Sequence, residues 1–148
     1  MNNEPITEFQ GEYRFLSNFW PAEVEYDGDI YPTVEHAYQA AKTLDRQGRL
    51  SIMNAATPGI AKRLGKTLPL RRNWEQMKYS VMLSLVGQKF CSHMDLGDKL
   101  LATNKRVLIE GNTWDDTYWG VYRGKGQNML GKLLMQVREE VRWQENSG

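Results

Sequence analysis

The order of apolar and polar positions along the chain predicts several helices and a few short strands. Apolar residues recur at helical spacing in 33–44, 49–56, 57–65, 73–90, 95–103 and 127–143. Short strands are expected in "EFQGEY", "EVEYDGDIY", "RVLIE" and "YWGVY", and Asp27-Gly28 is a typical hairpin turn. The pattern therefore predicts an α+β fold over 1–148: a mostly helical single domain with a small antiparallel sheet.

Several helix ends are marked by particular residues. Thr33 is expected to cap the first helix, and Thr57 with Pro58 is expected to begin the third, which Gly65 ends. Asn73, with a glutamine three residues later, resembles a capping box. The last residues, "QENSG" (144–148), are expected to be disordered.

Composition and charge narrow the class of protein. The 148 residues suit one domain, and no run approaches the roughly 18–20 apolar residues of a membrane span. The start of the chain does not resemble a signal peptide, and the single Cys91 favours a cytoplasmic location. Residues 1–45 carry nine acidic and two basic side chains, whereas residues 46–148 carry seventeen basic and nine acidic. This imbalance favours an anionic ligand but is too mild to indicate a sequence-reading nucleic-acid protein.

Polar residues recur on one face of the first helix. Glu35, Gln39 and Lys42 are spaced four and three residues apart, so they share that face. They form either a solvated stripe or the wall of a pocket, and spacing alone leaves both open. In a pocket, Glu35 would act as acid or base, and a Lys42 amine of lowered pKa could attack an electrophilic carbon. We expect the neighbouring His36 to be structural.

The predicted loops are rich in aromatic, polar and glycine residues, a composition typical of binding loops. Asp115 and Asp116 either cap a turn or supply a carboxylate that stabilises positive charge or binds ribose. Trp74 either packs in the core or stacks on a base, with Arg71 and Arg72 on a phosphate. "GKGQN" before the last helix suggests a phosphate cradle with Lys125. Asn18 and Phe19 form a polar-aromatic loop, and Cys91 and His93 are expected to be structural.

The order of the motifs resembles one known family. "FLSNFWP", "DGDIYPTVEHAYQAAK", "AKRLGK", "LRRNWEQMKYSVM", "LLAT", "LIEGNTWDDTYWG" and "GKGQNMLGKLLMQVR" together resemble the NADAR (YbiA-like) family from about Phe15 to Arg138. The resemblance implies an N-glycosidase, and because the sequence has no cluster of metal ligands, we expect the reaction to use no metal or cofactor. Its substrate would be ADP-ribosylated guanine in nucleic acid, or a ribosylaminopyrimidine phosphate intermediate of riboflavin synthesis. The chain departs from the family pattern in "GNTWDD" (111–116).

The resemblance also implies roles for individual residues. It makes Glu35 and Asp116 catalytic and Lys42 a nucleophile that forms a Schiff base with the anomeric carbon. Together with the loop motifs, it gives a set of binding residues: Asn18, Phe19, Gln39, Arg72, Trp74, Trp119, Gly120, Lys125 and Asn128.

Two other classes of function remain open. The chain could be a non-catalytic module that binds ADP-ribose or a related nucleotide, or a protein that associates with nucleic acid through its basic part. Its expected partner is a phosphorylated, ribose-containing small molecule or ADP-ribosylated nucleic acid, and not a membrane. The sequence makes no prediction of oligomeric state.

Overall fold

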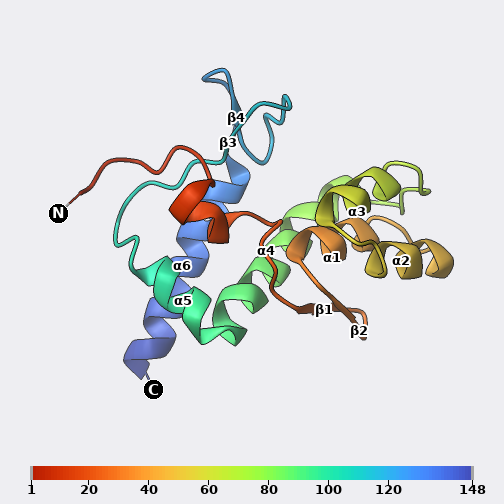
Figure 1. The fold of residues 1–148 in the computed structure, drawn as a ribbon, viewed down its shortest axis with the longest axis horizontal. Helices are drawn as coiled ribbons and strands as arrows, with labels where there is room; N and C mark the ends of the chain where they lie inside the picture. Colours follow the sequence, from red (N-terminus) through yellow and green to blue (C-terminus); the bar gives the residue numbers. More distant parts are fainter. Residues whose placement is uncertain (1, 148) are drawn as a thin grey trace. The chain divides into compact units, whose positions relative to one another are not determined.

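The structure, a computed structural model, describes residues 2–147. Its elements follow one another along the chain as shown in Figure 1: the 3-10 helix η1 (Gly11–Leu16), β1 (Val24–Tyr26), β2 (Asp29–Tyr31), α1 (Val34–Ala41), α2 (Arg46–Met53), α3 (Pro58–Gly65), α4 (Trp74–Ser92), α5 (Met94–Leu101), β3 (Gly111–Asn112), β4 (Val121–Tyr122) and α6 (Met129–Ser147). The predicted α+β class, mostly helical with a small antiparallel sheet, is confirmed.

The chain forms two compact units, which we describe separately. Unit 2 runs from Asn18 to Lys89 and holds β1, β2, α1, α2, α3 and most of α4. Unit 1 comprises the described residues up to Ser17 and from Phe90 onward, with η1, α5, β3, β4 and α6. The single-domain organisation of 1–148 stays a prediction.

Unit 2 is built around α1. This helix packs on both α2 and α3, and its alanines Ala37, Ala40 and Ala41 are buried, so the helices can approach closely. The hairpin β1–β2 pairs Val24 with Tyr31. Its turn has positive φ at Asp27 and at the following glycine, as the predicted tight hairpin turn requires.

Helix caps in unit 2 follow the sequence. The side chains of Thr33 and Thr57 accept hydrogen bonds from the amides three residues later, at the starts of α1 and α3. Asn73 differs from the expected cap because its φ is +61°, and its backbone carbonyl accepts from the amides of Gln76 and Met77.

Unit 1 is organised by α6. Leu130, Leu133, Leu134 and Val137 of this helix are buried at helical spacing. The N-terminal segment joins the unit through a parallel bridge between Ile6 and Leu108.

Some predicted elements differ in the structure. The strand expected at 8–13 does not form: Gly11–Leu16 is a 3-10 helix, because Gly11 leaves the extended region with φ +59°. "RVLIE" forms only the bridge at Leu108, and β3 and β4 pair in parallel. The first helix ends at Ala41 instead of Leu44.

The chain end also differs. Helix α6 continues through residues 144–147, so the expected disorder is wrong there, and Gly148 lies outside the described residues. Within residues 2–147, no helix combines the length and apolar character needed to cross a membrane.

Candidate active site

The polar row on α1 is buried. Glu35 is 7% exposed and Gln39 is 3% exposed, so the solvated-stripe alternative is wrong. The amide Nε2 of Gln39 donates to Oε1 of Glu35 at 2.9 Å, which fixes the carboxylate on the helix. The Asn18 carbonyl accepts from the Glu35 backbone amide at 3.1 Å, so the polar-aromatic loop covers the start of α1. Two expected site residues, Glu35 and Gln39, therefore form one hydrogen-bonded pair.

A glycine on α3 explains how this pair fits between helices. A Cβ on Gly65 would lie 2.0 Å from Oε1 of Gln39, a distance no side chain can tolerate. Gly65 ends α3, as predicted, and its lack of a side chain also makes room for Gln39. The same Oε1 is buried without a hydrogen-bond partner.

Lys42 is the residue immediately after α1 and is half-buried. Its Nζ lies 5.4 Å from the centroid of the Tyr38 ring, one turn earlier on the helix. That ring also contacts Trp74 at the start of α4, with ring centroids 5.3 Å apart. Trp74 is itself buried and packs as a core residue.

Burial lowers the pKa of the Lys42 ammonium below its ordinary value. The negative charge of Glu35 opposes this change, whereas the positive charges of Lys62, Lys66 and Lys78 add to it. A larger fraction of Lys42 is therefore neutral near pH 7 than for an ordinary lysine. A neutral amine is the form that can attack carbon.

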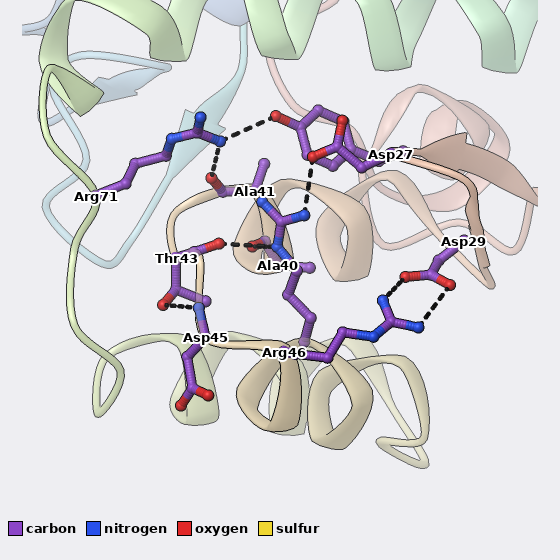
Figure 2. A network of polar contacts seen from close by, with 10 residues as sticks. Asp27, Asp29, Ala40, Ala41, Thr43, Asp45, Arg46 and Arg71 are labelled. Carbon is purple, nitrogen blue, oxygen red and sulfur yellow. Dashed lines mark hydrogen bonds and ion pairs between the residues drawn. The ribbon is translucent and has the colours of Figure 1, made fainter.

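Two arginines hold the chain segment that carries Lys42. Nε of Arg49 donates to the carbonyls of Ala40 and Thr43, at 3.1 and 2.8 Å. The backbone amide of Arg71 donates to the Lys42 carbonyl at 2.8 Å. Its side-chain Nη1 donates to the Ala41 carbonyl, as Figure 2 shows. The carbonyls of residues 40–43 at the end of α1 thus all have partners, and that of Ala40 also accepts from the Thr43 amide at 3.3 Å.

The remaining candidates of unit 2 fall into different environments. Arg72 is exposed, whereas Arg71 is committed to α1 and to the hydroxyl of Tyr26. Nδ2 of Asn18 lies 3.5 Å from the sulfur of Met82, and Phe19 is half-buried.

His36 is structural, as expected. Its Nε2 contacts the Ala55 carbonyl at 3.1 Å, which can only accept, so Nε2 carries the proton. Nδ1 then accepts from the Thr33 hydroxyl at 2.7 Å. Both ring nitrogens are therefore used.

In unit 1, Asp116 forms a tight turn. Its Oδ1 accepts from the backbone amides of Tyr118 and Trp119, at 3.1 and 2.9 Å. The side chain of Asn112 donates to the Asp116 carbonyl and accepts from the Asp116 amide. The turn-cap interpretation of this aspartate is therefore confirmed, and its catalytic role stays a prediction. The rings of Tyr118 and Trp119 meet edge to face.

The predicted phosphate cradle at the start of α6 is wrong. The amides of residues 127–130 already donate to the carbonyls of residues 117–120. Asn128 also bonds backbone, since its Oδ1 accepts from the Glu110 amide and its Nδ2 donates to the Leu108 carbonyl. Gly120 has no room for a Cβ, which would meet the Glu110 carbonyl at 2.2 Å. Lys125 is exposed, so only its side chain could meet a phosphate.

Sequence reasoning missed several residues that act on Lys42 or on the chain beside it, most of them from other elements. Tyr38, Arg49, Lys62, Lys66 and Lys78 were not among the candidates. The motif "AKRLGK" contained two of these lysines, but spacing within one helix cannot reveal which neighbour that helix packs against.

Comparisons with known proteins identify the family of the chain. The family model described as the NADAR domain matches residues 6–142. N-glycosidase YbiA of Escherichia coli (strain K12) is 44% identical over 135 residues, which cover 88% of this chain and 82% of that protein. N-glycosidase Npun_R5314 of Nostoc punctiforme is 40% identical over 136 residues, 88% of this chain and 86% of that protein.

A longer relative and a solved structure extend the comparison. The chloroplastic riboflavin biosynthesis protein PYRR of Zea mays is 38% identical over 144 residues, which cover 85% of this chain and 23% of that protein. The NMR structure of the E. coli protein YbiA matches with a TM-score of 0.87 and 38% identity, covering 100% of this chain and 90% of that one. The chain belongs to the NADAR domain family.

Proposed function

We propose that this chain is an N-glycosidase in which Glu35 transfers protons and Lys42 is the nucleophile. The observation that carries the proposal is the buried Glu35–Gln39 pair, which lies on the same helix face as a half-buried lysine. N-glycosidase is also the activity named for the relatives from Escherichia and Nostoc.

The first step would cleave the glycosidic bond. The neutral amine of Lys42 forms a bond to the anomeric carbon C1′ while the C1′–N bond to the base breaks. The departing nitrogen keeps the electron pair and takes a proton from Glu35, which then accepts the surplus proton of the new Lys42 ammonium. The carboxylate is well placed for such exchange because Gln39 fixes its orientation.

The second step would regenerate the enzyme. The C1′–O4′ bond opens, O4′ takes a proton, and the lone pair of Lys42 forms an imine with C1′. Water then adds to C1′ and releases the free sugar and the lysine amine. The net reaction consumes one water for each base released.

The substrate class proposed is a ribosylaminopyrimidine phosphate. Relatives named riboflavin biosynthesis proteins, from Zea mays and Vibrio vulnificus, support this small-molecule class over ADP-ribosylated nucleic acid. The catalytic role of Asp116 and the substrate-binding role of Trp119, which the family resemblance implies, stay predictions. We also propose a cytoplasmic location, because a single cysteine suits a reducing compartment.

Turnover of a ribosylaminopyrimidine 5′-phosphate by purified variants tests the proposal. Glu35→Gln should lower kcat by about 10²- to 10⁴-fold with unchanged circular dichroism. Glu12→Gln, an exposed glutamate of η1, is the matched control and should keep full activity. Full activity in Glu35→Gln would disprove its role. Tight binding of ADP-ribose without release of any base would instead favour the binding module.

A further inference from the structure

We propose that Lys62, Lys66 and Lys78 form a phosphate-binding cluster that holds the 5′-phosphate of the ribose whose C1′ reacts at Lys42. The inference rests on the proposed function and names the binding group of the same site. We call these three residues the lysine cluster.

Helix α3 brings two of the three lysines to the end of α1. Gly65 contacts Gln39, and Gln39 lies one turn before Lys42. Lys62 and Lys66 are four residues apart and therefore lie on one face of α3, on either side of Gly65 along the chain. Lys62 is half-buried, and Lys66 is the exposed residue just after the helix.

Helix α4 brings the third lysine. The Tyr38 ring contacts both Lys42 and Trp74, so the first turn of α4 lies beside the end of α1. Lys78 is one turn after Trp74 on the same face of α4. Its side chain is only 18% exposed and pairs with Glu75 at 2.5 Å, an ion pair that orders the lysine.

The electrostatics agree with this packing. Each member of the lysine cluster lies close enough to lower the pKa of Lys42. The positive charges of the three lysines act on that of Lys42, and a bound anion would offset them. The 5′-phosphate is joined to the furanose ring through one carbon. Cations close enough to act on the nucleophile that attacks C1′ are therefore also close enough to contact this phosphate.

The hydrogen bonding of Gln39, one turn before Lys42, is also incomplete. Oε1 of Gln39, 3% exposed and adjacent to Gly65, is buried without a hydrogen-bond partner. A sugar hydroxyl is the kind of donor that such an oxygen lacks. Among the phosphate ligands expected from the sequence, Arg71 is bonded to α1 and the amides at the start of α6 are occupied, whereas Arg72 and Lys125 are exposed.

Direct binding tests the cluster without requiring turnover. Calorimetry would compare ribose 5-phosphate, inorganic phosphate and ribose on the wild type. We expect ribose 5-phosphate to bind best and ribose not to bind measurably. Lys62→Gln and Lys78→Gln should each weaken binding of ribose 5-phosphate by roughly tenfold. Arg63→Gln, which removes the same charge from an exposed position of α3, should change it less than about twofold.

The pKa of Lys42 provides a second measurement, made by NMR after ¹³C reductive methylation. Inorganic phosphate should raise this pKa because it offsets the neighbouring cations. Lys62→Gln should raise it without phosphate, because one cation is gone, and should reduce the further rise on adding phosphate. In Arg63→Gln, the pKa of Lys42 should equal that in the wild type, with and without phosphate.

The outcomes separate this inference from the proposed function. Binding that depends on the lysine cluster supports the inference even if no substrate is turned over, in which case the proposed function fails. Equal turnover of a substrate with and without its 5′-phosphate would overturn the inference and leave the N-glycosidase intact. Equal loss of binding in Arg63→Gln and Lys62→Gln would also overturn it, since net charge alone would then explain the effect.

Discussion

Replacing Arg49 by methionine should destabilise the protein far more than the same change at Arg46. Both arginines lie in α2 and pair with aspartates of the β1–β2 hairpin, as Figure 2 shows for Arg46 and Asp29. The side chain of Arg49 is only 9% exposed, whereas that of Arg46 is 60% exposed. The two variants therefore remove the same charge and the same kind of ion pair from a buried and an exposed position.

The expected difference follows from what each guanidinium satisfies. Arg49 is bonded to the carbonyls of Ala40 and Thr43, and leaving the Thr43 carbonyl buried without this donor costs about 1–3 kcal/mol. The Ala40 carbonyl would lose its shorter bond and keep that from the Thr43 amide at 3.3 Å, which adds a smaller cost. Its pair with the half-exposed Asp27 adds little. We therefore expect a loss of about 3 kcal/mol in the free energy of unfolding for Arg49→Met. For Arg46→Met the loss should be below about 1 kcal/mol.

Urea denaturation followed by circular dichroism measures this difference. With an m value of about 1.5 kcal/mol/M, the midpoint should fall by roughly 2 M in Arg49→Met and by less than about 0.7 M in Arg46→Met. Turnover measured well below the midpoint should also fall in Arg49→Met, because the carbonyls it holds flank Lys42. Equal midpoint shifts would refute the reasoning, because burial would then make no difference.

Two further changes probe the neighbourhood of the pair. Gly65→Ala places a methyl group about where Oε1 of Gln39 lies, so it should displace that side chain and lower kcat/KM, measured by steady-state kinetics. Gly59→Ala in the same helix makes only an ordinary contact, 3.8 Å from the Thr57 hydroxyl, and should keep full activity. Equal kinetics in both variants would contradict this account. Burial lowers the pKa of His36 below its ordinary 6.5, so the unfolded chain takes up a proton that the folded chain does not. The free energy of unfolding should therefore fall as pH decreases below 6.5, and urea melts of His36→Gln should lose this dependence while those of His93→Gln keep it. Melts of His36→Gln with an unaltered pH dependence would count against burial of a neutral ring.

Local chemistry made part of the fold predictable. The Asp27-Gly28 turn and the Thr57 and Gly65 ends of α3 depend on backbone conformations and caps that a few neighbouring residues determine. The 3-10 helix at 11–16 was missed because Gly11 interrupts an apparently extended stretch with a positive φ.

Long-range packing limited what the sequence could reveal about the site. Spacing placed Glu35, Gln39 and Lys42 on one face, but only the packing of α3 on α1 shows that this face is buried. The predicted phosphate cradle at Lys125 was wrong for a similar reason, because the amides at the start of α6 donate to the carbonyls of residues 117–120, which lie before the motif in the chain.

Reductive trapping tests the central claim most directly. The protein would be incubated with a ribosylaminopyrimidine 5′-phosphate and sodium borohydride, digested, and analysed by mass spectrometry. The account predicts a phosphoribityl adduct on Lys42, with none in Lys42→Arg. Release of base by the wild type with no adduct at Lys42, or with the adduct on another lysine, would contradict it.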